Sequence, residues 1–176
     1  EKPQFGIQSV QVNGVDVTIR ERVEIDKPFC ELRRFKRFSD HPATLDTLLG
    51  QPPVLIVAPL SGHYATLLRD TVKSMLPYCN AVYITDWKNA REVPLDKGIF
   101  HFNTYVHELE AYMDTIGSRV HVMAVCQPVV QVLIAAARQH NHPMRPLSMT
   151  LMASSICEVV AMLVAAPEAP PPMAMS

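Results

Sequence analysis

The sequence predicts an α/β fold with a mostly parallel sheet and an antiparallel hairpin near its N-terminal end. Two observations lead to this prediction. From residue 54 onward, short apolar runs alternate with segments of helical spacing, which is typical of βαβ units in a parallel sheet with helices on both faces. Before residue 54, polar and apolar residues alternate as they do in strands with one buried face.

The N-terminal strands are expected at 8–12, 15–19 and 30–38. Asn13 and Gly14 separate the first two strands and predict a type I′ hairpin, because both turn positions favour a positive φ. The third strand contains the run 33–37, in which basic residues surround an aromatic one. We interpret this run as a solvated strand face, and contact with a granule or a nucleic acid is the alternative.

The parallel sheet is expected to begin at 54–58, where an apolar run without alternation indicates a strand covered on both faces. Further strands are expected at 82–85, 120–125 and 147–152, and helices at 64–76, 102–116 and 129–139. The domain prediction is a partial α/β domain at 1–152, a short apolar helix at 153–164, and a disordered Pro/Ala-rich tail at 165–176.

Composition limits the classes of partner. The 176 residues are enough for one domain, and 16 Lys+Arg against 17 Asp+Glu give a net charge of -1, so a polybasic protein that binds nucleic acid is excluded. The 4 cysteines are widely spaced and form no CxxC pair, so we expect neither a disulfide framework nor a metal site, and no organic cofactor. We also expect no membrane span and a cytoplasmic location, because long apolar stretches and a secretory signal are not found.

The turn after the strand at 120–125 carries the strongest chemical signal, because reactive groups in an open parallel sheet lie at the carboxyl ends of strands. Here Cys126 closes a strand, and Pro128 stands where a helix begins. This is the layout of a nucleophile elbow, usually G-x-S-x-G, with Cys126 for serine and with Ala124 and Pro128 for the glycines. A buried core cysteine is the alternative interpretation.

An elbow of this kind needs two N–H donors for the oxyanion of a substrate. The main chain of Gln127, which follows the cysteine, would supply one of them. The loop after 54–58 would supply the other through Leu60 or Ser61, and Gly62 permits a backbone conformation that turns an amide towards the site. A plain β-to-α turn is the alternative for this loop.

Several motifs in the same order resemble the intracellular polyhydroxyalkanoate (poly-3-hydroxybutyrate) depolymerases, which are α/β-hydrolases. These motifs are KPFC at 27–30, PPVLIVAPLSGHYATLLRDTV at 52–72, VYITDWKNAR at 82–91, HVMAVCQP at 121–128 and SMTLM at 148–152. The resemblance runs from about residue 5 to residue 152. It implies that Cys126 is a nucleophile and that the substrate is a polyester or a short-chain hydroxyacyl ester associated with cytoplasmic storage granules.

The acid and the histidine of an α/β-hydrolase follow the nucleophile in the chain, yet neither Asp nor His occurs after residue 152. We therefore expect a family member truncated after the strand that follows the nucleophile helix. Its function is then ester hydrolysis through a cysteine acyl-enzyme. The alternative is a catalytically incompetent fragment that binds acyl chains or polymer or associates with itself. A sheet that lacks strands exposes an edge, which predicts a homo-oligomer.

His63 is the histidine expected at the carboxyl edge of the sheet. It either forms a dyad with Cys126 or shapes the oxyanion loop through its own hydrogen bonds. Asp86 and Trp87, which follow the next strand, are expected at the rim of the substrate site, and capping of a helix is the alternative for Asp86. The histidines at 140 and 142 lie between a helix and the next strand, which predicts that they lie at the opposite edge.

Overall fold

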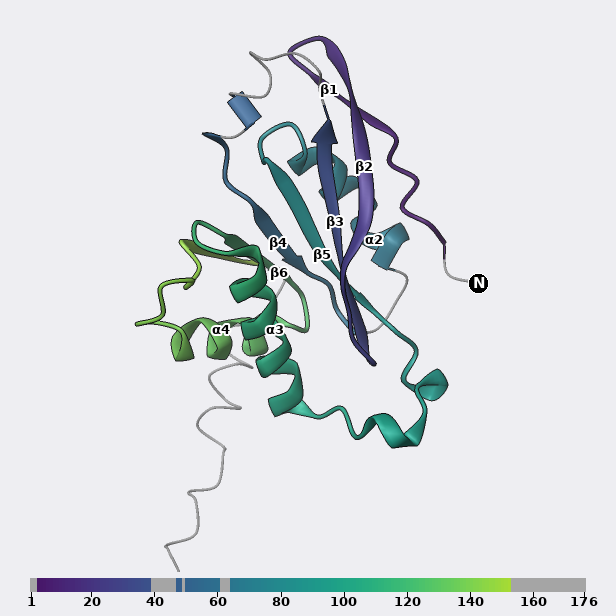
Figure 1. Ribbon diagram of the computed structural model, residues 1–176, viewed down its shortest axis with the longest axis vertical. Helices are drawn as coiled ribbons and strands as arrows, with labels where there is room; N and C mark the ends of the chain where they lie inside the picture. Colours follow the sequence, from purple (N-terminus) through teal and green to yellow (C-terminus); the bar gives the residue numbers. More distant parts are fainter. Residues whose placement is uncertain (1–2, 39–46, 49, 61–63, 153–176) are drawn as a thin grey trace, which may run out of the picture.

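The computed structural model describes residues 3–38, 47–48, 50–60 and 64–152, and the expected helix at 153–164 and tail at 165–176 lie outside them. Its sheet has seven strands in the order β1-β2-β3-β5-β4-β6-β7 (Figure 1). The strands are β1 (Ser9–Val12), β2 (Val15–Asp26), β3 (Cys30–Phe38), β4 (Val54–Val57), β5 (Ala81–Trp87), β6 (His121–Val125) and β7 (Ser148–Met152). The helices are α2 (Tyr64–Met75), α3 (Phe102–Ile116) and α4 (Val129–Arg138), with the short 3₁₀ turns η1 (Ala90–Glu92) and η2 (Leu95–Lys97).

The N-terminal strands form the antiparallel part of the sheet. β1 pairs with β2, β2 with β3, and β3 with β5, each in antiparallel fashion. Asn13 and Gly14 have φ angles of 51° and 80°, which confirms the predicted type I′ hairpin. β2 is longer than predicted, because its charged second half pairs with β3 instead of ending near residue 19.

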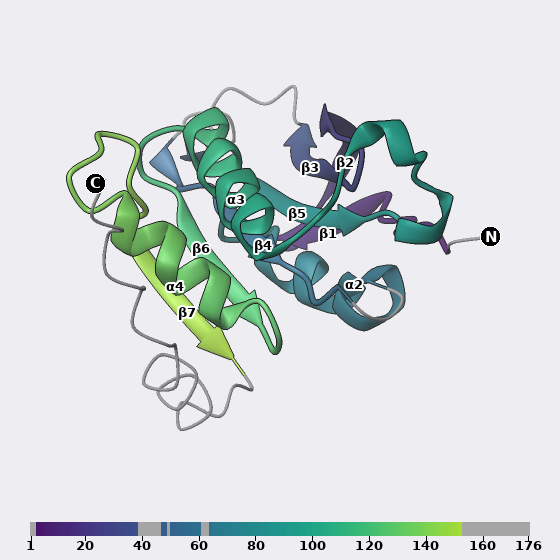
Figure 2. The same cartoon turned by 90° about the horizontal axis from the view of Figure 1, so that it is seen from below.

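The remaining pairings are parallel: β4 with β5, β4 with β6, and β6 with β7. Because β2 and β5 both run opposite to β3, β2 points the same way as these four strands, and the sheet is mostly parallel, as predicted. All residues of β4 are buried. The helices explain this burial, since α3 and α4 cover one face of the sheet and α2 lies on the other (Figure 2).

The basic run in β3 differs from its prediction as a solvated face. Arg37 is only 3% exposed, and its guanidinium donates to the carbonyl oxygens of Pro77 and Cys79 at 3.0 and 3.1 Å. A buried arginine needs such acceptors, and they come from the segment between α2 and β5. The prediction is therefore wrong for Arg37, while Lys36 is exposed as expected.

Exposed apolar side chains of the described residues include those of one loop and one strand. The loop between β5 and α3 projects from the sheet (Figure 1) and carries Leu95 and Ile99, which are 98% and 82% exposed. All residues of β7 are exposed as well, and this strand has β6 as its one neighbour within the described part of the chain. Of the described helices, none combines the length and the apolar character needed to cross a membrane.

Candidate active site

Cys126 lies directly after β6 and has a φ of 66°. A residue with a Cβ rarely adopts this left-handed conformation, and nucleophile elbows have a strained strand-to-helix turn of this kind. The thiol-bearing residue is exposed, whereas Cys30 and Cys79 are buried. The alternative of a core cysteine is therefore excluded for Cys126.

Hydrogen bonds on both sides hold the turn. The main-chain N–H of Cys126 donates to the carbonyl of Met152 in β7 at 2.8 Å, and the Val132 N–H donates to the Pro128 carbonyl at 2.9 Å. Pro128 occupies the N-cap of α4, where the missing N–H costs nothing. For the main-chain N–H of Gln127, no hydrogen-bond partner is found among the described residues.

The loop after β4 begins at Ala58, whose two polar groups are both bound. Its N–H donates to Thr85 Oγ1 at 2.9 Å, and its carbonyl accepts from Trp87 Nε1 at 2.8 Å and from the Tyr105 hydroxyl at 3.5 Å. β5 and α3 therefore fix the direction in which this loop leaves the sheet. Sequence reasoning missed Thr85 and Tyr105, although a threonine in an otherwise apolar strand is a signal for such a contact.

The structure brings the two predicted oxyanion elements together. The main-chain N–H of Leu60 donates to the side-chain oxygen Oε1 of Gln127 at 3.0 Å. This contact joins the loop after β4 to the turn after β6. Ser61 and His63 lie outside the described residues, so their predicted roles stay predictions.

Trp87 and Asp86, the predicted rim residues, are both buried, with 5% and 3% exposure. The Trp87 ring packs edge-on against Tyr105, with ring centroids 4.4 Å apart. Asp86 lies within β5, and the cap of the following turn η1 is Asn89, whose side chain accepts from the Arg91 N–H. Both the rim role and the capping role of Asp86 therefore stay predictions.

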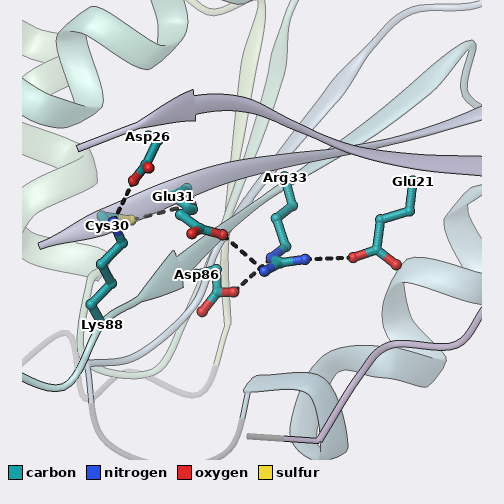
Figure 3. A network of polar contacts seen from close by, with 7 residues as sticks. All are labelled: Glu21, Asp26, Cys30, Glu31, Arg33, Asp86 and Lys88. Carbon is teal, nitrogen blue, oxygen red and sulfur yellow. Dashed lines mark hydrogen bonds and ion pairs between the residues drawn. The ribbon is translucent and has the colours of Figure 1, made fainter. Parts of the chain in front are cut away.

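Arg33 joins Asp86 to two further carboxylates in a polar network (Figure 3). Its Nε donates to Asp86 at 2.6 Å, and its terminal nitrogens donate to Glu21 and Glu31 at 2.8 Å each. The carboxylates raise the pKa of the Arg33 guanidinium against the opposing effect of burial. These four residues line a cavity of about 830 Å³ beside the end of β5.

The buried thiols have no catalytic environment. Burial raises the pKa of Cys30 far above its ordinary value, and burial also raises the pKa of Cys79. Both thiols therefore stay protonated and unreactive at neutral pH. Cys126 is the described cysteine whose exposure permits attack on a substrate.

Two of the described histidines lie at the edge of the sheet opposite Cys126. His121 Nδ1 contacts Ser148 Oγ at 2.6 Å, where β6 and β7 begin, and His142 Nδ1 lies 3.4 Å from Asp114. These positions are at the amino edge of the parallel strands, as the sequence predicts for 140 and 142. Among the described residues, no group of three or more His, Cys, Asp or Glu is arranged to hold a metal ion.

Comparison with known proteins identifies the fold. No protein-family model matches the chain, and no curated protein matches its sequence. Among solved structures, an arylesterase has a TM-score of 0.51 at 10% identity, over 80% of this chain and 46% of its own. The chain has the α/β-hydrolase fold.

Other solved structures similar to this chain are a membrane phospholipase A described as a bacterial virulence factor and a naproxen esterase from Bacillus subtilis. The phospholipase is 16% identical with a TM-score of 0.49, over 79% of this chain and 40% of its own. The esterase is 12% identical with a TM-score of 0.44, over 76% and 42%. The chain thus spans less than half the length of these structures.

Proposed function

We propose that this chain carries the nucleophile and oxyanion half of an ester hydrolase, with Cys126 as the nucleophile. The observation that carries the proposal is an exposed thiol on a left-handed turn between β6 and α4. The N-terminal end of α4 directs its partial positive charge at this turn, which suits a substrate oxygen that develops negative charge there. The Gln127 N–H is adjacent and can donate a hydrogen bond to a substrate oxygen as that oxygen becomes negatively charged.

The reaction is acyl transfer in two steps. In the first, the Cys126 sulfur forms a bond to the ester carbonyl carbon, and the carbon–oxygen bond breaks as the alcohol leaves with a proton. In the second, water attacks the thioester and its hydroxyl remains on the acyl product, while the thiol regains its proton. His63 is the residue of this chain proposed to carry these protons.

The proposed substrate is a 3-hydroxyacyl ester, either a polyester on a cytoplasmic granule or a short oligomer. The sequence resemblance to depolymerases supports this class. Leu95 and Ile99 support it independently, because their loop begins at the carboxyl end of β5 and presents apolar side chains that suit contact with an apolar polymer.

A second candidate is a catalytically incompetent module that binds acyl chains or associates with itself. Strand β7 favours this candidate, because it is exposed and lies at the edge of the sheet that the described residues form, and a strand edge without a neighbour pairs readily with another chain. We propose a homo-oligomer on the same ground. Light scattering across a concentration series tests it, and a monomer at every concentration contradicts it.

A chromogenic 3-hydroxybutyryl ester tests the hydrolase. We expect the wild-type protein to release chromophore and C126A to lose this activity, while both keep the same circular dichroism spectrum. The Cys126 mechanism is abandoned if the protein shows no turnover or if C126A retains it. Iodoacetamide labelling followed by mass spectrometry measures the thiol directly, and a slower reaction at Cys126 in H63A supports the dyad.

A further inference from the structure

The hydrogen bond between Leu60 and Gln127 links two segments that are 67 residues apart in the chain. It is exposed, so its net contribution to the stability of the fold is small. Fixing a glutamine side chain nevertheless costs rotamer entropy. The main consequence of this contact is therefore geometric: it sets the distance between the loop after β4 and the turn that bears Cys126.

The residues before Leu60 explain why this contact fixes the position of the loop. Ala58 is held by Thr85 and by Trp87, and Pro59 has no N–H to donate. The next main-chain donor along the described loop is the N–H of Leu60, and it is already directed at the Gln127 side chain. The loop is thus tied to β5 at its start and to the nucleophile turn at Leu60.

We propose that Gln127 is a positioning residue, with separate tasks for its main chain and its side chain. The main-chain N–H stays available for the substrate oxygen, and the side-chain oxygen holds the loop after β4 through Leu60. This inference rests on the proposed function, because the loop has to be placed for an oxyanion. The side chain itself does not touch the substrate.

Two substitutions separate the acceptor oxygen from the size of the side chain. Q127M keeps the length of the side chain and removes the acceptor, whereas Q127E keeps an acceptor oxygen; both keep the main-chain N–H. We expect Q127M to lower kcat for the chromogenic ester about 3- to 10-fold, the effect of one neutral hydrogen bond, with KM nearly unchanged. We expect Q127E to lie between Q127M and the wild type. Q11M, at an exposed position of the distant strand β1, is the matched control and should keep both constants.

The outcome that overturns the proposal is a kcat for Q127M equal to or above that of the wild type, or a change in KM alone. A raised kcat would mean that the side chain blocks the Leu60 N–H instead of placing the loop. Unfolding temperatures of all variants show whether any loss of rate comes from misfolding.

Hydrogen exchange of the Leu60 amide tests the contact without a substrate. Q127M should speed this exchange, while Q11M should leave it unchanged. Equal exchange in Q127M and the wild type overturns the proposal even if the ester is hydrolysed. Conversely, absence of turnover in the wild type contradicts the proposed function, and the exchange rate still decides whether Gln127 holds the loop.

Discussion

Replacement of Cys126 by glycine is expected to leave the fold more stable than replacement by alanine. The φ of 66° costs a residue with a Cβ about 1–2 kcal/mol, and glycine avoids this cost. Glycine also loses about 0.5–1 kcal/mol more backbone entropy on folding, so the net advantage is about 0.5–1 kcal/mol. For a chain of this length, that difference raises the unfolding midpoint of C126G over C126A by about 1–4 °C.

Thermal and urea unfolding followed by circular dichroism measure this difference. Arg119 has a φ of 76° outside the site, so R119G should likewise exceed R119A in stability. Asp16 lies in strand β2, and glycine weakens a strand, so D16G should be less stable than D16A. If glycine is favoured at Arg119 but disfavoured at Cys126, the backbone of the turn is not strained and the nucleophile assignment loses its main support.

Three further predictions concern buried polar groups. W87F removes the indole N–H that donates to the Ala58 carbonyl. We expect the free energy of unfolding in urea to fall by about 1–2 kcal/mol, and kcat in the ester assay to fall as well. Burial raises the pKa of Glu108 above its ordinary 4.5, so the folded protein binds this proton more tightly than the unfolded chain. Stability should therefore fall as the pH rises from about 4.5 through the raised value, and E108Q should flatten that dependence when melting is measured across pH. R33M removes the arginine that binds the buried carboxylate of Asp86. We expect it to lower the free energy of unfolding by about 2 kcal/mol, a figure reduced for the partial exposure of Arg33. The double variant R33M/D86N should recover part of this loss in the same unfolding assay.

The strands and the sharp turn at Cys126 could be predicted because their signals are local. The apolar run that became β4 has no polar position, so it indicates burial on both faces without knowledge of its neighbours. The turn could be predicted because Cys126 stands between an apolar strand and a proline. Each of these signals depends on residues that are close together in the chain.

The contacts that place the site could not be predicted in this way. The Leu60–Gln127 bond depends on two loops meeting at the end of the sheet, and the bonds to Ala58 depend on β5 and α3. The burial of Arg37 likewise depends on carbonyl groups about 40 residues further along the chain. Their geometry follows from strand order, which the periodicity of the sequence does not encode.

The bond from the Cys126 N–H to the Met152 carbonyl has a consequence for synthesis of the chain. The ribosome adds Cys126 to the chain before Met152. The nascent chain therefore contains the cysteine before the carbonyl of β7 is present to accept the hydrogen bond from its N–H. The turn then lacks one of the contacts that hold its left-handed backbone. This part of the support for the Cys126 turn is therefore added only when β7, the last described strand, has joined the sheet.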